Sequence, residues 1–350
     1  MSIVPEHAVF IDPSSEHFLE NKLFDKDDAF LNRDGTLLPF VRMKEALEAR
    51  GIPVHTADRL RDGTVTARMN HYWSLGLLDS YTPLLARSDV RLRGFLVMEP
   101  ALVAPHLYRA LPKISQDFES VWLHNVNGDG YSTDGVDASK LHKFFWPQPY
   151  PCEQQEFWSK TDRSNRWIVI AGNHNPRWRM PEFYSRRIEA VAELTQDNRV
   201  DLYGRDWDKW WSIHSAWLPY WLNRRALMQA YRGTCVSKLE ILSRYHYSLC
   251  YENTPVQGFI TEKIFDCFYA GTVPVYLGAP DIDKWIPSSC YIDARRFSHV
   301  QEMWDFVQGQ SDTERELMKW AGRDFLSSSQ GQRYFNSIKD ICGDGFEHHA

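Results

Sequence analysis

Three consecutive side chains, Thr261, Glu262 and Lys263, bring a hydroxyl, a carboxylate and an ammonium group to one point of the chain. The apolar spacing after them predicts a helix that begins here, with Thr261 capping it through its hydroxyl. Exposed first-turn amides and the helix dipole favour an anion, so a lysine in this turn is reasonable when a phosphate binds beside it. Glu262 has the chemistry to accept hydrogen bonds from the two hydroxyls of a ribose. A pair of solvated surface charges explains these residues equally well.

Two predicted strands flank this helix. Residues 247–251 form a short apolar and aromatic run typical of a buried strand, and residues 252–258 carry the Asn, Thr, Pro and Gly of a loop. Gly271 stands where a C-terminal glycine ends a helix, and residues 273–277 have the composition of a second strand, with a proline near its start. The segment is therefore expected to be one βαβ unit.

Residues 238–297 resemble the donor-binding segment of the α1,3/α1,4-fucosyltransferases, which form glycosyltransferase family 10. The likeness consists of four elements in order: a tyrosine-rich strand, a Glu-Asn-Thr turn, a Thr-Glu-Lys helix start and a Val-Pro-Val-x-x-Gly strand. The resemblance implies an α/β protein of GT-B architecture, in which two Rossmann-like domains with parallel sheets face each other across a cleft. It also implies inverting transfer of L-fucose from GDP-fucose to a glycan hydroxyl, as in glycan biosynthesis.

The resemblance assigns donor-binding roles to further residues. Asn253 belongs to the Glu-Asn-Thr turn, whose asparagine contacts the donor in relatives, and Phe259 stands where relatives carry a tyrosine or another aromatic residue. Lys238 precedes the tyrosine-rich strand and is expected to face the donor. Tyr203 lies in a Leu-Tyr-Gly turn that resembles the turn near the base pocket of the family.

The start of the second half carries candidate phosphate contacts. Residues 167–171 read as a strand, and the small glycine-containing loop after it, which includes Asn175, allows the backbone to approach a phosphate closely. Such a loop is weak evidence alone. Arg179 stands just before a Phe-Tyr pair, where relatives have an arginine on the diphosphate, and Arg177 is the alternative. Fixed cations here would stabilise the negative charge on a departing GDP.

Glu99 is the candidate general base. It follows a predicted strand at 94–98, and ligands of open α/β sheets bind beyond the carboxyl ends of strands. Transfer of a sugar to a hydroxyl needs a group that accepts the hydroxyl proton. Position alone favours a solvated loop glutamate, but the family resemblance supports a catalytic one, since relatives place a glutamate just before a proline at this strand end. His124, in a later loop, is the less favoured substitute.

Two acidic segments are poor candidates for metal sites. Residues 125–137 approximate a calcium loop, but Val136 occupies the position of the bidentate glutamate. Asp281 and Asp283 form an Asp-x-Asp pair that follows the last strand of a βαβ unit, where a solvated turn is expected. We therefore predict no metal ligand and no cofactor, with GDP-fucose as the donor substrate.

Length and charge restrict the class of protein. A chain of 350 residues suits two domains, predicted at 1–155 for an acceptor-side Rossmann-like domain and 156–330 for the donor domain. Residues 331–350 are expected to form a tail that packs back on the first domain, and residues 152–165 to form a linker. A net charge of −6 argues against a nucleic-acid partner.

Location and partners are expected to follow from the same features. The six cysteines show no paired spacing typical of zinc or redox sites, and no apolar run approaches the length of a membrane span. Together with the lack of a signal peptide, this predicts a cytoplasmic protein. Animal relatives in the family carry a membrane anchor, so the resemblance implies a bacterial-type enzyme, either soluble or peripheral at the inner membrane face. Its partners would be the nucleotide sugar and an oligosaccharide or lipid-linked glycan.

Residues 207–232 are rich in tryptophan, including Trp210, Trp211, Trp217 and Trp221. A platform for the acceptor is one interpretation, and packing is the favoured one for most of these rings.

Two other functions remain open on the sequence alone. The same fold could use a different nucleotide sugar, because no residue type distinguishes fucose from a similar deoxysugar. A non-catalytic glycan- or nucleotide-binding module would bind the ligand without consuming it. A nicotinamide dehydrogenase is disfavoured, because no G-x-G-x-x-G motif follows the first strand of either half.

Overall fold

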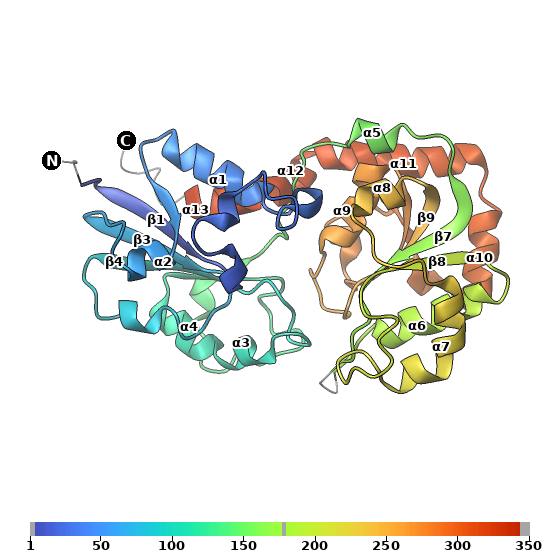
Figure 1. The fold of residues 1–350 in the computed structure, drawn as a ribbon, viewed down its shortest axis with the longest axis horizontal. Helices are drawn as coiled ribbons and strands as arrows, with labels where there is room; N and C mark the ends of the chain where they lie inside the picture. The colour runs from blue at the N-terminus through green and yellow to red at the C-terminus, as the bar shows by residue number, and fades with distance from the viewer. Residues whose placement is uncertain (1–3, 177–179, 344–350) are drawn as a thin grey trace. The chain divides into compact units, whose positions relative to one another are not determined.

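The computed structural model describes residues 4–176 and 180–343, and the chain divides into two α/β units (Figure 1). Unit 1 contains the chain up to Pro149 and again from Arg333, and unit 2 contains Tyr150–Gln332. The chain thus passes between the units twice, at positions close to the boundaries of 155 and 330 expected from the sequence.

Unit 1 is built on a six-stranded sheet in the order β2-β1-β3-β4-β5-β6, in which all neighbouring strands are parallel. The resemblance implied a Rossmann-like domain with a parallel sheet, and the parallel sheet is confirmed. The strands are β1 (His7–Asp12), β2 (Val54–Thr56), β3 (Met69–Ser74), β4 (Val90–Leu96), β5 (Ser120–Leu123) and β6 (Leu141–Lys143). The helices are α1 (Leu38–Glu48), α2 (Asp58–Arg61), α3 (Pro105–Arg109), α4 (Leu111–Asp117) and α13 (Ser337–Gly343).

The core of unit 1 lies on both faces of this sheet. Residues 8–11 of β1 are at most 1% exposed, as expected for a parallel strand covered on both sides. Phe40, Met43 and Leu47 form an apolar face of α1, and they pack in one cluster with Val9 of β1 and with residues of α13.

Arg42 of α1 holds the segment of the chain that returns to unit 1. The guanidinium group of Arg42 donates to the carbonyl oxygens of Pro149 at 2.7 Å, Gln148 at 2.8 Å and Phe335 at 2.8 Å. This single side chain joins the segment that leaves unit 1 to the segment that returns to it.

Unit 2 contains a five-stranded parallel sheet in the order β11-β10-β9-β7-β8. The strands are β7 (Ser164–Ile170), β8 (Val200–Tyr203), β9 (Tyr245–Tyr251), β10 (Val273–Leu277) and β11 (Ile292–Asp293). The helices are α5 (Gln155–Trp158), α6 (Tyr184–Thr195), α7 (Leu218–Ala230), α8 (Lys238–Leu242), α9 (Glu262–Ala270), α10 (Val300–Gln308) and α11 (Asp312–Ser327), and α12 (Ser329–Phe335) runs through the second boundary. Short 3-10 helices of unit 2 lie at Ile282–Lys284, Ser288–Cys290 and Ala294–Arg296. Those of unit 1 lie at Glu16–Phe18, Lys22–Phe24, Arg33–Gly35, Thr82–Leu84 and Ala138–Lys140.

The predicted βαβ unit is confirmed as β9, α9 and β10. Gly271 ends α9 in the left-handed conformation, with φ of 69°. Tyr251 and Leu277 are register partners at the ends of the parallel pair β9 and β10, so the residues that follow them emerge at the same edge of the sheet.

The predicted linker at 152–165 is wrong. It contains α5, whose Trp158 is only 6% exposed, and the first residues of β7. Arg163 makes this packing possible, because its guanidinium group donates to the carbonyl oxygens of Phe157 at 3.1 Å, Trp158 at 3.1 Å and Ala270 at 2.9 Å. None of the helices within residues 4–176 and 180–343 has the length and apolarity needed to cross a membrane.

Candidate functional site

The carboxyl ends of β7, β8, β9 and β10 lie along one edge of the sheet of unit 2, because these strands are parallel. We call this the carboxyl edge, formed by residues 171–176, 204–206, 252–263 and 278–281. The chain leaves β7 toward β8 on one side, whereas β9 lies on the other side of β7. Ligands of open α/β sheets bind outside the carboxyl ends at such a reversal. This edge is therefore where a ligand site is expected.

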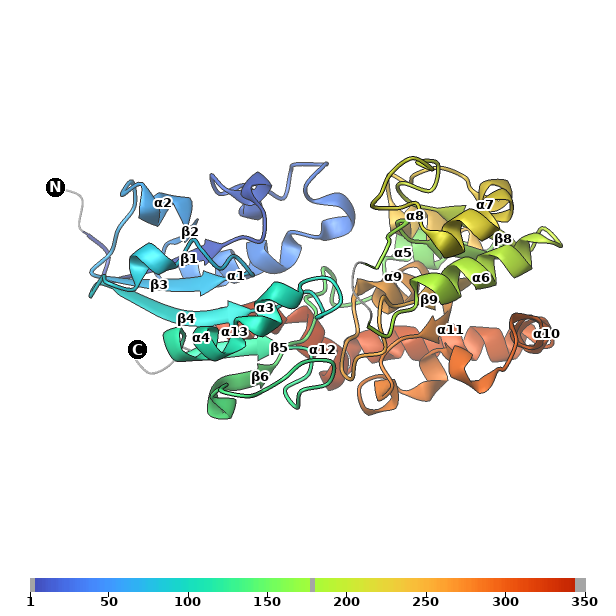
Figure 2. The same cartoon turned by 90° about the horizontal axis from the view of Figure 1, so that it is seen from below.

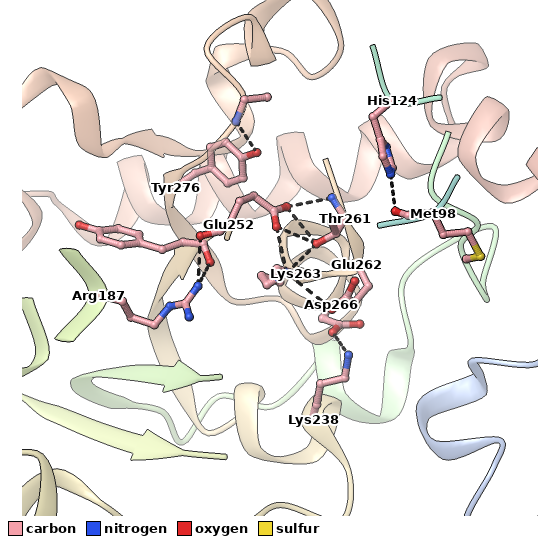
Figure 3. A network of polar contacts seen from close by, with 12 residues as sticks. Met98, His124, Arg187, Lys238, Glu252, Thr261, Glu262, Lys263, Asp266 and Tyr276 are labelled. Carbon is pink, nitrogen blue, oxygen red and sulfur yellow. Dashed lines mark hydrogen bonds and ion pairs between the residues drawn. The ribbon is translucent and has the colours of Figure 1, made fainter. Parts of the chain in front are cut away.

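Glu252 contacts both Thr261 and Lys263 at this edge (Figure 3). It is fully buried, and its Oε1 accepts from the backbone N–H of Thr261 at 2.8 Å. The Thr261 hydroxyl lies 3.0 Å and 2.9 Å from its two oxygens, and Lys263 Nζ lies 2.9 Å from Oε2. A buried carboxylate is tolerated when it is paired and hydrogen-bonded in this way. Glu252 thus ties the end of β9 to the entrance of α9.

The predicted capping role of Thr261 is wrong. Thr261 occupies the N-cap position of α9, but its side chain makes no capping hydrogen bond. Its hydroxyl is instead engaged by Glu252 and accepts from Lys263 Nζ at 2.9 Å. No hydroxyl cap therefore covers the first-turn N–H groups of α9. The N–H of Glu262 bonds its own carboxylate, and the other N–H groups of this turn are suited to an anion.

Lys263 carries a permanent positive charge at this helix entrance. Burial lowers the pKa of its ammonium group, but the carboxylates of Glu252 and Glu262 raise the pKa by more, so that it lies well above the usual value. An ammonium group has three hydrogens, and Glu252 and Thr261 accept two of them. The third can be donated to a phosphate oxygen, since the side chain remains 21% exposed. Its role as a phosphate ligand stays a prediction.

Glu262 is held as an anion. Burial raises the pKa of its carboxyl group, but the ammonium groups of Lys263 and Lys238, together with hydrogen bonds from its own backbone N–H and from Thr261, lower it by more, to about 2. Its Oε1 lies 3.8 Å from Lys263 Nζ. An ionised carboxylate accepts hydrogen bonds only, which is the chemistry expected for binding ribose hydroxyls.

Lys238 points its ammonium group at α9. Lys238 Nζ lies 2.5 Å from the buried Asp266 on α9. Ser237, which precedes it, caps α8 by accepting from the N–H of Glu240 at 3.2 Å. The structure thus assigns Lys238 a contact between α8 and α9, and direct contact with the donor is untested.

The turn at Asn253 is fixed by α6. Arg187 on α6 is 3% exposed, and it donates to the carbonyl oxygens of Tyr251 at 2.5 Å and Glu252 at 3.1 Å. Burial lowers the pKa of this guanidinium group. The carbonyl oxygen of Asn253 accepts from the N–H of Phe183 at 2.9 Å. The backbone of the turn is therefore held in place, and the Asn253 side chain lies half-buried beside the carboxyl edge.

The loops after β7 and β8 approach each other very closely. A Cβ at Gly204, whose φ is 145°, would lie 1.8 Å from the carbonyl oxygen of Ala171, so only glycine fits there. The N–H of Asn175 donates to the carbonyl oxygen of His214 at 2.9 Å. Asn175 therefore stands at the carboxyl edge, and half-buried Tyr203 is the last residue of β8.

Three other candidates have different outcomes. Phe259 is 1% exposed, so its ring packs against protein atoms, and contact with a sugar stays a prediction. Arg179 and its alternative Arg177 lie outside the described residues.

The acidic segments rejected as metal sites have structural contacts. Asp281 accepts from the N–H of Gly258 at 2.7 Å and from Trp285 Nε1 at 3.1 Å. Asn125 accepts from the N–H of Asn127 at 2.8 Å, which closes its own loop. Within residues 4–176 and 180–343, no three His, Cys, Asp or Glu residues are grouped to hold a metal ion. The absence of a metal from the reaction is untested.

Glu99 follows the carboxyl end of β4 in unit 1. β4 is parallel to both neighbours, β3 and β5, which is the condition on which its prediction as base depends. Glu99 is exposed, and its carbonyl oxygen accepts from the hydroxyl of Tyr108 at 3.1 Å. The backbone is thus anchored while the side chain reaches solvent.

His124 is a poor substitute for Glu99. It is 2% exposed, and its Nε2 lies 2.6 Å from the carbonyl oxygen of Met98, next to Glu99 (Figure 3). Burial, with a smaller effect from Lys143, lowers its pKa to about 3. A carbonyl oxygen only accepts, so Nε2 carries the hydrogen of a neutral ring. An imidazole with so low a pKa is a weak base, and the structure gives it the task of holding the backbone beside Glu99.

Glu252, Arg187 and Asp266 were not among the predicted site residues. Glu252 has the clearest signal, because it is an acidic residue directly after a buried strand and is joined by a short loop to a Thr-Glu-Lys helix start. Arg187 and Asp266 have none, since their partners come from distant parts of the chain.

Comparison with known proteins places this site in a family. Residues 158–342 match the family described as "Glycosyltransferase family 10 (fucosyltransferase) C-term". An α-(1,3)-fucosyltransferase FucT of Helicobacter pylori is 29% identical over 99 residues, which cover 28% of this chain and 21% of that protein. A GDP-fucose protein O-fucosyltransferase 3 of Xenopus tropicalis is 31% identical over 137 residues, which cover 39% of this chain and 27% of that protein. The matched segments therefore span less than a third of these relatives.

Solved structures agree in fold. A crystal structure of an α1,3-fucosyltransferase aligns with a TM-score of 0.52 at 15% identity, over 100% of this chain and 93% of that chain. HepE of Anabaena, in complex with UDP and glucose, aligns with a TM-score of 0.54 at 12% identity, over 97% of this chain and 99% of that chain. The predicted α/β class with two parallel-sheet domains is confirmed.

Proposed function

Because the chain belongs to glycosyltransferase family 10, the fucosyltransferases, we propose that it transfers L-fucose from GDP-fucose to a glycan hydroxyl with inversion at the anomeric carbon. The names of its relatives, an α-(1,3)-fucosyltransferase and a GDP-fucose protein O-fucosyltransferase, support the donor. The observation that carries the proposal is the entrance of α9. There, a permanently charged lysine and first-turn amides without a hydroxyl cap meet at the carboxyl edge of a parallel sheet.

The proposed donor contacts follow from this arrangement. The diphosphate would accept from Lys263 and the first-turn amides of α9, and Glu262 would accept from the ribose hydroxyls. Arg179 would add a second cation. Glu252 would hold Lys263 in place before the donor arrives, so little reorganisation would be needed when charge develops.

The chemical step would be a single displacement. The acceptor oxygen attacks C1 of fucose as the bond between C1 and the β-phosphate oxygen breaks, and the electron pair of that bond leaves with GDP. Glu99 takes the proton from the attacking hydroxyl. Lys263 and Arg179 stabilise the charge that GDP gains. A positioned base of this kind typically contributes about 10²–10⁴-fold to the rate.

Isothermal titration with GDP, GDP-fucose and UDP-glucose tests the donor. We expect GDP and GDP-fucose to bind in the micromolar range, with the same affinity when EDTA is present. Binding of UDP-glucose without binding of GDP would contradict the choice of donor.

Replacing Glu99 by Gln tests the base. Turnover of GDP-fucose should fall at least about 10²-fold while the affinity for GDP is unchanged. Glu119→Gln is the matched control, because it removes an exposed glutamate of unit 1 that pairs with Arg93. Full activity in Glu99→Gln would remove this residue as the base.

The class of acceptor can be separated by product mass. Relatives are named both for glycan linkage and for protein fucosylation, so a screen should offer oligosaccharides and serine- or threonine-containing peptides with GDP-fucose. The proposal expects mass gain on an oligosaccharide. Mass gain on peptides alone would keep the donor and replace the acceptor, and binding of GDP-fucose without product would indicate a non-catalytic module.

A further inference from the structure

Unit 2 carries an exposed apolar surface on α7 and the loop before it. We call it the tryptophan surface. Its rings contact one another, since the Trp210 ring centroid lies 5.9 Å from that of Trp211 and 6.1 Å from that of Trp221. The members and their exposed fractions are Trp210 (50%), Trp211 (65%), Leu218 (69%), Trp221 (45%) and Leu222 (75%).

The packing of unit 2 does not account for this surface. α7 packs on α6 (Figure 2), and Tyr220, Leu227 and Ala230 form its buried face. Leu218 and Leu222 are four positions apart and Trp221 lies between them, so they share a second face, which is exposed. The packing interpretation is confirmed for Trp207 and Trp217, which lie in or against the core of unit 2. It does not hold for Trp210, Trp211 and Trp221, which are at least 45% exposed.

The loop that carries the rings is anchored. Trp207 is 1% exposed, and its Nε1 donates to the carbonyl oxygen of Ala171 at 2.7 Å. The hydroxyl of Tyr220 donates to the carbonyl oxygen of Trp207 at 2.8 Å. The hydroxyl of Ser215 donates to the carbonyl oxygen of Lys209 at 3.1 Å. The outward rings therefore extend from a loop that buried side chains hold.

The charge around this surface is opposite in sign to that of the chain. Residues 204–232 contain five arginines and lysines against two aspartates, whereas the whole chain has a net charge of −6. Lys209 pairs with Asp206, and Arg232 pairs with Asp201, so the excess positive charge lies on Arg205, Arg224 and Arg225. Arg225 is exposed and lies one turn beyond Trp221 and Leu222 on α7. Basic side chains at the border of an apolar face complement an anionic surface.

We propose that the tryptophan surface docks on a bilayer that contains anionic phospholipid. Tryptophan favours the boundary between headgroups and hydrocarbon, because its ring is apolar and its N–H is polar. Exposed leucines gain from burial in acyl chains, and the neighbouring arginines gain from the headgroup phosphates. A sugar platform uses ring faces and gives Leu218 and Leu222 no role, so the observations favour a lipid surface.

Docking would have a consequence for orientation. The loop begins at Gly204, where β8 reaches the carboxyl edge, and the N–H of Asn175 at that edge donates to the carbonyl oxygen of His214 in the loop. Contact through Trp210 and Trp211 would therefore bring the carboxyl edge near the bilayer, where lipid-linked acceptors reside.

Flotation with vesicles tests the proposal. The whole protein is mixed with vesicles of phosphatidylcholine alone or of phosphatidylcholine with phosphatidylglycerol. We expect flotation with the anionic vesicles, and at least about 10-fold weaker partitioning for Trp221→Gln/Leu222→Gln. Phe30→Gln/Leu317→Gln is the matched control, because it removes two exposed apolar side chains elsewhere (86% and 64% exposed) and should float as the wild type does.

A second variant and a second readout keep the outcomes distinct. Arg224→Gln/Arg225→Gln should weaken flotation with anionic vesicles and leave binding to phosphatidylcholine unchanged. GDP affinity should be the same in all variants, so failure of docking is separate from failure of the donor assignment. The proposal is overturned if the wild type does not float or if Trp221→Gln/Leu222→Gln floats equally well. It is also overturned if that variant changes only KM for a soluble oligosaccharide, or if it converts a wild-type dimer to a monomer in sedimentation velocity.

Discussion

Replacing Glu252 by Gln removes one charge of a buried ion pair and keeps the shape of the side chain. Glu252 is fully buried, and its Oε2 lies 2.9 Å from Lys263 Nζ. At that separation the direct attraction is about 6 kcal/mol in a medium with an effective dielectric constant of about 20, before the cost of removing both groups from water. Removing one partner of a buried pair typically costs about 3–5 kcal/mol. Because Lys263 is 21% exposed and can recover some hydration, we expect about 3 kcal/mol.

Equilibrium unfolding in urea measures this loss, provided that the transition of unit 2 is followed separately, since two units need not unfold together. Glu240→Gln is the matched control, because it breaks an exposed pair with Arg244 on a helix of the same unit. Exposed pairs contribute about 0–1 kcal/mol.

A double-variant cycle separates the pair from other effects. Glu252→Gln/Lys263→Met removes both charges, and replacement of a buried pair by neutral groups is often close to neutral. The double variant should therefore be more stable than Glu252→Gln alone. A loss for Glu252→Gln no larger than that for Glu240→Gln, or strictly additive losses, would refute the reasoning.

Two further predictions concern pH and packing. The pKa of His124 is lowered from 6.5 to about 3 in the folded protein. As the pH falls below about 6.5, the unfolded chain therefore binds a proton at this residue while the folded chain does not. The free energy of unfolding then decreases by about 1.4 kcal/mol per pH unit from this group alone. His124→Gln should lose that part of the pH dependence in unfolding experiments between pH 7.5 and 5.5. If the free energy of unfolding of the variant changes with pH as steeply as that of the wild type, the imidazole of His124 is not held neutral by burial. A Cβ at Gly278 would lie 2.2 Å from the hydroxyl oxygen of Tyr276, so Gly278→Ala should lower the unfolding free energy by about 1–3 kcal/mol. A Cβ at Gly343 would have nothing within 4 Å, so Gly343→Ala should not lower it. Equal stability of the two glycine variants would contradict the close packing.

The βαβ unit could be predicted because its information is local. The apolar period changes from strand to helix and back, and Gly271 marks the end of α9, so the bounds of β10 were obtained as the structure has them. A strand directly before Glu99 was likewise predicted from a local apolar run, and because β4 is parallel to both neighbours, Glu99 follows its carboxyl end.

The contacts of the site could not be predicted, because they are long-range. In the sequence, Glu252 belongs to a polar loop. Its burial depends on contacts with Thr261 and Leu277, which come later in the chain and hydrogen-bond to it. The same contact explains why Thr261 does not cap α9, since its hydroxyl is hydrogen-bonded to Glu252. Helical spacing alone cannot decide which apolar face of α7 is buried, so Trp221 was assigned to packing.

Titration of GDP into Lys263→Met tests most directly whether the entrance of α9 binds the diphosphate. Loss of a hydrogen bond to a charged group typically costs about 1.5–3 kcal/mol, so we expect affinity for GDP to fall by about 10- to 150-fold. The fall should also occur in Glu252→Gln/Lys263→Met, which controls for damage caused by an unpaired carboxylate, and Lys284→Met, at an exposed lysine, should bind as the wild type does. Folded variants without Lys263 that bind GDP with wild-type affinity would contradict the account.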